Sequence, residues 1–171
     1  MKHWLLISMF IAIVITLTIS CHPVSKGEGV MVFPNWRQYY NLTPEIINSD
    51  AHNAYVEIYL NEKAKEAYIN VEPHFKKGSK IFKPLYVDPK GKYFARLVIM
   101  VKMDEGYDSE NGDWWYGVYD ESGTKMRYEG RIPECIACHA MAKETDYLFS
   151  RSVMKKLKGI HTNEFEEYLK D

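Results

Sequence analysis

The chain has 171 residues, of which 46% are hydrophobic and 26% are charged, which is the composition of an ordinary globular protein. Lys and Arg total 22 against 23 Asp and Glu, so the net charge is −1 and there is no basic surplus to neutralise phosphates. This balance argues against nucleic acid as a partner, and the length suits one domain after an N-terminal leader.

Residues 1–21 have the pattern of an export signal. Lys2 and His3 precede an apolar run, Trp4 to Ile19, that is shorter than the ~20 residues of a comfortable membrane span. The residues before Cys21 resemble the cleavage box of bacterial lipoproteins, which implies that Cys21 becomes a lipidated N-terminus. The alternative is an uncleaved anchor with an unmodified Cys21. We expect a domain tethered by lipid to a membrane surface, in the periplasm or another extracytoplasmic space.

Residues 22–35 are rich in Pro, Gly and Ser and predict a tether, which is followed by a single domain over residues 36–171. A short helix is expected to begin near Pro34. A second helix is predicted to start at Thr43, because Thr suits the capping position and the following Pro44 suits the first turn.

The middle of the chain predicts strands with short connections. Segment 53–60 alternates and is rich in Tyr, Val and Ile, which is typical of a strand, and a helix over 61–68 is capped by Asn61. Pro84 is expected to mark a sheet edge or a bulge. Further strands are predicted over 79–87, 93–103, 114–119 and 125–128, and helices near Cys135 and over 150–158 and 163–170. Short turns favour an antiparallel sheet with helices packed on one side, an α+β domain.

The sequence Cys135-Ile136-Ala137-Cys138-His139 is the most specific local signal. Two thiols three residues apart on a helical turn can bond the two vinyl groups of one haem, and the next residue presents its imidazole to the iron. We therefore predict one covalently attached haem c, bound by Cys135 and Cys138, with His139 as an iron ligand.

Three alternatives to haem attachment are weaker. A zinc site would need a second pair of ligands, and the sequence has no second CxxC. A thioredoxin-like redox pair usually lacks a His at this place, and a structural disulfide does not account for His139.

The late position of the motif favours a five-coordinate haem with an open side that binds small molecules. Met141 is too close to His139 to reach the opposite face of the haem, whereas Met154 remains a candidate sixth ligand. Single histidines are more often surface or core residues than ligands, but three could serve in principle: His52, His74 and His161.

Four stretches in order resemble the cytochrome P-460 family, which includes the cytochromes c′-beta, from about Trp36 to Phe149. They are Pro133–His139 with the acidic-aromatic run 143–150, then 56–61, 78–83, and 100–102 with 112–116. The resemblance implies an antiparallel-sheet domain, usually a homodimer, with one haem per chain. It also implies small nitrogen species, hydroxylamine or nitric oxide, as substrates or ligands.

Two positions carry particular expectations from this resemblance. Hydroxylamine-oxidising members bond a Lys covalently to the haem macrocycle, and Lys83 matches that position, although from the residues alone it would be a solvated strand residue. The distal carboxylate of those members falls at or near Val98, which cannot relay a proton.

Three functions therefore remain open. The first is an oxidoreductase acting on hydroxylamine or nitric oxide with a redox partner protein. The second is a nitric oxide-binding protein without turnover, and the third is an electron carrier.

Overall fold

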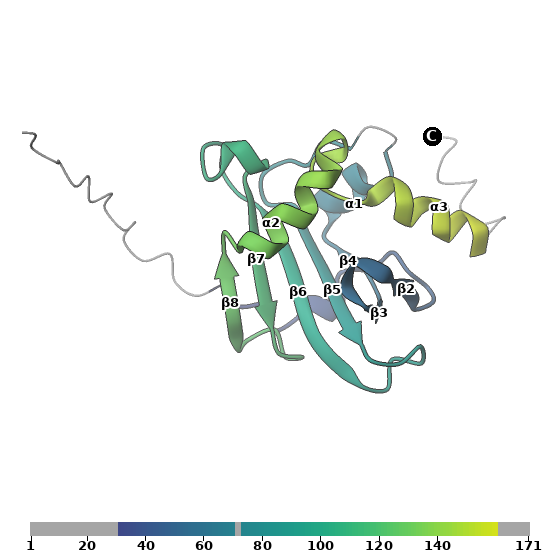
Figure 1. The fold of residues 1–171 in the computed structure, drawn as a ribbon. Coiled ribbons are helices and arrows are strands. Elements are labelled where there is room, and N and C mark those ends of the chain that lie inside the picture. The colour runs from purple at the N-terminus through teal and green to yellow at the C-terminus, as the bar shows by residue number, and fades with distance from the viewer. Residues whose placement is uncertain (1–30, 71–72, 161–171) are drawn as a thin grey trace, which may run out of the picture.

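A computed structural model describes residues 31–70 and 73–160 of the chain (Figure 1). Its antiparallel sheet has the strand order β1-β4-β5-β6-β7-β8, with β3 also paired to β5 and β2 paired to β3. Together with three α-helices, this confirms the predicted α+β class. Within the described residues, no helix is long and apolar enough to cross a membrane.

The elements follow the order of the sequence. The strands are β1 Tyr40–Asn41, β2 Ile47–Ser49, β3 Ala54–Val56, β4 Tyr59–Leu60, β5 Lys80–Tyr86, β6 Phe94–Lys102, β7 Trp114–Tyr119 and β8 Met126–Gly130. The α-helices are α1 Glu62–Tyr68, α2 Pro133–His139 and α3 Ser150–Ile160, and the 3₁₀-helices are η1 Trp36–Gln38, η2 Asp50–His52, η3 Ser109–Asn111 and η4 Ala140–Thr145.

The strands predicted over 79–87, 93–103, 114–119 and 125–128 are confirmed as β5 to β8, and the helix predicted over 150–158 is confirmed as α3. Their ends are shifted by at most two residues. The short helix expected near Pro34 forms as the single turn η1. The export signal 1–21, its lipidation site Cys21 and the helix predicted over 163–170 lie outside the described residues.

Alternation along the central strands gives the sheet two apolar faces. On one face, the side chains of Phe82, Leu97 and Ile99 pack into an aromatic cluster with Phe33 and Trp36. Phe33 meets the Phe82 ring edge-on at 5.4 Å, so this face is covered by Trp36 and by Phe33, which lies in the segment predicted as a tether.

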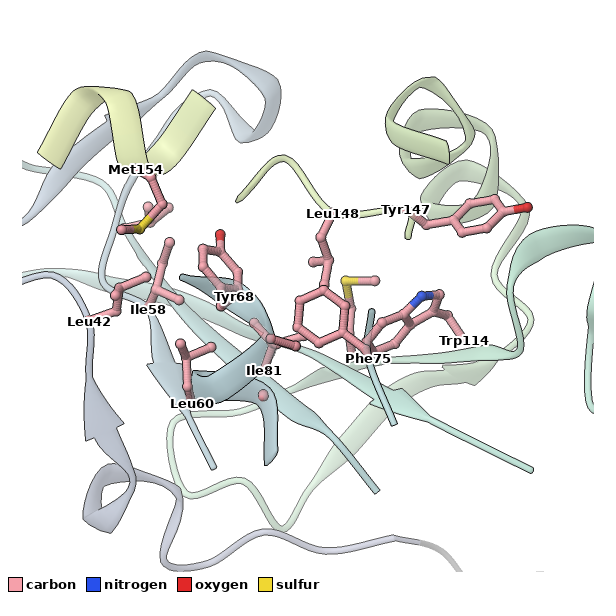
Figure 2. Packing of buried hydrophobic residues seen from close by; sticks show 14 of the residues in the cluster. Leu42, Ile58, Leu60, Tyr68, Phe75, Ile81, Trp114, Tyr147, Leu148 and Met154 are labelled. Carbon is pink, nitrogen blue, oxygen red and sulfur yellow. The ribbon is translucent and has the colours of Figure 1, made fainter. Parts of the chain in front are cut away.

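The opposite face carries Ile81, Met100 and Tyr116 and packs against all three α-helices in one cluster, which we call the helix-face core. Figure 2 shows part of this core, with Met154 of α3 beside Leu42 and Ile58. In Figure 1, α2 crosses in front of β6 and β7, while β2 and β3 lie on the far side of β5. The elements that bear the site are therefore arranged around one face of the sheet.

Asn61 caps α1 as predicted and also joins the helix to the sheet. Its Oδ1 accepts hydrogen bonds from the backbone N–H groups of Ala64 at 3.1 Å and Lys80 at 2.9 Å. Its amide donates to the Gly78 carbonyl at 2.8 Å. One side chain thus fixes the start of α1 and the start of β5.

The helix predicted to start at Thr43 is wrong, because the Thr43 hydroxyl has another partner. Its Oγ1 accepts from the backbone N–H of Ile58 at 2.9 Å and donates to Asn41 Oδ1 at 3.1 Å. A hydroxyl engaged by the neighbouring strands cannot cap a helix, and the chain continues into the short strand β2 instead.

The strand predicted over 53–60 is divided into β3 and β4. The division lies opposite Pro84 of β5, where the Glu57 N–H donates to the Pro84 carbonyl over 3.4 Å but Pro84 has no N–H to return a bond. The ladder with β5 is therefore interrupted at this pair, while the N–H of Ile58 points away from β5 and donates to Thr43 Oγ1. Of the two expectations for Pro84, the sheet edge is wrong, because β5 is an interior strand. A bulge or irregularity lies close by, since the register with β6 shifts between Leu85 and Tyr86.

We predict that Asn61→Ala lowers the free energy of unfolding by about 2 kcal/mol, because the cap of α1 and its link to β5 are both lost. Urea denaturation of the purified protein measures the change. Ser122→Ala, in an exposed turn, serves as the control and should change stability by less than about 0.5 kcal/mol. Equal stability of the Asn61 variant and the wild type would contradict this role.

Candidate functional site

The helix α2 begins at Pro133, whose fixed φ suits the first turn, and carries Cys135, Cys138 and His139. All three residues line a cavity of about 410 Å³. The cavity is bounded by α2, the central strands β5 to β7, the segment 47–52 and the start of α3. The surface of its lining is mostly apolar, as in sites for large apolar cofactors, and charged side chains such as Lys83, Arg96 and Glu134 contribute the rest with other polar groups.

The cavity brings together the predicted site residues that fall within the described part of the chain. Lys83 of β5 and Val98 of β6 line it with the three residues of α2. Lys83 and Val98 are direct partners in the β5–β6 ladder, so their side chains lie on the same face of the sheet.

The His139 ring is held in one orientation by three contacts. Its Nδ1 donates a hydrogen bond to the Tyr147 carbonyl over 2.6 Å, since a carbonyl can only accept. The ring lies 5.5 Å from the Tyr116 ring and 5.6 Å from the Phe149 ring. Burial, with the nearby Lys83 charge, lowers the pKa of His139 to about 4. The neutral ring therefore keeps the Nε2 lone pair for a metal.

Lys83 is buried, with 8% of its surface exposed, which contradicts the solvated position expected from the residues alone. It forms no ion pair with any residue that the structure describes. Burial lowers the pKa of its amine to about 8, an effect that the Cys138 thiol partly opposes. An appreciable fraction of the amine is therefore uncharged near neutral pH.

Of the other candidate iron ligands that the structure describes, only His52 lines the cavity. Met154 packs in the helix-face core and Met141 is exposed, so neither lines the cavity. His74 is exposed, and His161 lies outside the described residues. His52 of η2, by contrast, lines the cavity. Burial, followed by the charges of Lys83, His139 and Arg96, lowers the pKa of His52 to about 3, so its ring is neutral.

Sequence reasoning missed Met100, which also lines the cavity, as does Tyr116. Met100 is two residues from Val98 on the same strand, so alternation was the available signal. The hydroxyl of Tyr116 is buried without a hydrogen-bond partner, and burial raises its pKa. Nothing in the local sequence indicated the contact of Tyr116 with His139.

Carboxylates are few in the cavity wall. Among the described lining residues they are Asp50 of η2 and Glu134 of α2, and the central strands contribute none. The sheet wall around Val98 therefore offers no carboxylate as a proton acceptor.

The donor set fits a covalently bound haem. Cys135 and Cys138 are free thiols on one helix, and the Nε2 of His139 is available beside them. No cluster of three or more His, Cys, Asp or Glu side chains suited to a metal ion is found over residues 31–70 and 73–160. Two thiols and one oriented imidazole on an apolar cavity define the haem site of a c-type cytochrome.

Comparison with known proteins agrees with this class. The chain belongs to the cytochrome P460 family, whose sequence profile matches residues 34–150. This confirms the resemblance inferred from the sequence, and family membership implies a haem c attached covalently through Cys135 and Cys138, with His139 as the iron ligand. A comparison with curated proteins found no match.

We predict that the double variant Cys135→Ala/Cys138→Ala loses covalent haem, because both thioether bonds are removed while the cavity remains. Haem staining after denaturing electrophoresis measures the attachment. Met141→Ala, an exposed change close to the motif, should keep the stain. A haem stain that survives the double substitution would refute the assignment of these thiols.

Proposed function

We propose that this cytochrome exposes one side of its haem to small nitrogen species, nitric oxide or hydroxylamine, which bind there or undergo redox chemistry. The observation that carries the proposal is the cavity itself. It places His139, Lys83 and Val98 around one apolar space, and neither Met154 nor Met141 enters it. An apolar cavity admits small uncharged ligands and keeps competing water low.

Ligand binding has stronger support than proton-coupled oxidation. Removing protons from a bound hydroxylamine needs a base within hydrogen-bond reach of the ligand. The sheet wall presents Val98, and the lining carboxylates come from η2 and α2 instead. Turnover with hydroxylamine would therefore have to use a group other than a carboxylate of the central strands.

We further propose that the Lys83 amine bonds to the haem macrocycle. Its support is the buried position of Lys83 in the cavity of His139 and the partly uncharged amine that burial produces. Bond formation between Nζ and a ring carbon releases one hydrogen from each atom. A peroxide accepts the two electrons and these hydrogens and leaves as two waters. The additional bond would alter the electronic structure of the ring.

We predict that Lys83→Ala loses a red-shifted Soret band in the reduced protein and returns an ordinary haem c spectrum. Mass spectrometry should show the wild-type haem peptide lighter by two hydrogen atoms and joined to the Lys83 peptide. Lys80→Ala, from the same strand but outside the cavity lining, is the matched control and should keep the wild-type spectrum. Identical spectra for wild type and Lys83→Ala would exclude the cross-link.

A second candidate function, electron transfer without turnover, is favoured by one observation. His52 lines the cavity with a neutral ring, and this ring makes no hydrogen bond within the described part of the chain. An imidazole in that state can serve as a sixth iron ligand. A haem with two His ligands would pass electrons but would not bind small molecules readily.

Absorption spectra discriminate the two functions. For an open site we predict a five-coordinate, high-spin reduced protein that binds nitric oxide stoichiometrically, with coordination unchanged in His52→Ala. A low-spin wild type that becomes high-spin in His52→Ala would instead establish the carrier. His74→Ala, at an exposed histidine, controls for loss of an imidazole elsewhere. Steady-state assays with hydroxylamine and an electron acceptor then separate enzyme from binding protein.

The setting of this site is also a proposal, supported by the sequence alone. We infer a homodimer that exchanges electrons with a redox partner protein. The export signal 1–21 and Cys21 support a periplasmic or extracytoplasmic protein held at the membrane surface by lipid.

A further inference from the structure

The carbonyl that orients His139 belongs to a backbone turn of unusual conformation. Asp146 has φ of 50° and Tyr147 has φ of 64°, so two successive non-glycine residues are left-handed. Such a conformation is unfavourable for side chains with a Cβ and persists only where surrounding contacts enforce it. The turn bears directly on the haem ligand, because the Tyr147 oxygen accepts the hydrogen bond from His139 Nδ1 over 2.6 Å.

The Asp146 carboxylate anchors this turn to two separate elements. Its Oδ1 is paired with Lys102 Nζ, at the end of β6, over 2.6 Å. Its Oδ2 accepts from the backbone N–H of Phe75 over 2.9 Å. The two side chains of the ion pair are only 15% and 10% exposed, so the attraction is weakly screened.

Backbone and aromatic contacts complete the anchor. The Trp114 indole donates to the Asp146 carbonyl over 2.9 Å, and the Lys102 amine lies 4.9 Å from the Trp114 ring centroid. Figure 2 shows Leu148 pointing toward Phe75 and Trp114, while Tyr147 extends away from it.

The Tyr147 side chain fixes the far side of the turn. Its hydroxyl donates to the Glu110 carbonyl over 2.9 Å. Its ring occupies the space beside Gly112, where an added Cβ would clash with the ring. Contacts from β6, β7 and two loops therefore determine where the Tyr147 carbonyl points.

We propose that Asp146 is a positioning residue for the haem iron, acting through the Tyr147 carbonyl on the His139 ring. A fixed, short Nδ1–H···O bond increases the negative character of the imidazole and so strengthens the bond from Nε2 to iron. A stronger donor favours the ferric state. The inference depends on haem attachment at α2 and is independent of the ligand that binds at the open side.

The test uses purified holoprotein of the variant Asp146→Asn, which keeps the size of the side chain but loses the charge and one acceptor. We expect the iron–histidine stretching band of the reduced protein to shift to lower frequency, and the reduction potential to rise. If the iron is six-coordinate, the reduction potential alone is the readout. An unchanged band and an unchanged potential would overturn the proposal.

Two controls separate positioning from general damage. Glu121→Gln removes an exposed ion pair of similar length, Arg37 to Glu121 at 2.7 Å, and should leave both readouts unchanged. Phe33→Leu weakens the aromatic cluster on the opposite face and should lower the melting temperature without moving the band. A shift in Phe33→Leu equal to that in Asp146→Asn would count against a specific role.

Trp114→Phe examines the same turn if the charge variant does not fold. It removes the hydrogen bond to the Asp146 carbonyl and no charge. A smaller shift of the band or the potential in the same direction supports the proposal, and an unaltered holoprotein contradicts it.

Discussion

The hydrogen bond from His139 to the Tyr147 carbonyl joins the haem-bearing helix to the rest of the domain. Helix α2 spans only Pro133–His139, a length that is not stable in isolation. Its position comes from the partly buried side chains of Ile132, Cys135 and Ile136 against the helix-face core, and from this bond at its end. The two thiols and the imidazole keep a common orientation because both ends of α2 are held.

Much of the fold follows from local patterns in the sequence. The strands β5 to β7 are predictable from runs of aromatic and β-branched residues between turn signals, β8 is predictable from the hairpin turn before it, and Asn61 caps α1 as its position predicted. The failures arise where a side chain has a distant partner. Thr43 has the chemistry of a helix cap, but its hydroxyl is used by Ile58, 15 residues away in sequence. No local pattern contains that contact.

The same distinction applies to the site. The Cys135–His139 motif is readable because both thioether bonds and the iron ligand come from one helical turn. Lys83, His52 and Asp146 are near the site only because of the tertiary fold. The fold brings β5, the 3₁₀-helix η2 and the turn at Asp146 close to α2. The resemblance to a family singled out Lys83, and the structure places it in the cavity. His52 could only be grouped with the other single histidines, which are more often surface or core residues than ligands.

The alternation of β5 limits how this domain can vary in length. Phe82 lies in the aromatic cluster and Lys83 in the cavity, so inserting or deleting one residue within β5 would exchange the two. The amine would then face aromatic rings, and the phenyl group would occupy the haem cavity. Related proteins should therefore differ in length at the connection between β5 and β6, where Val87 and Tyr93 are exposed, while the strands keep a constant length.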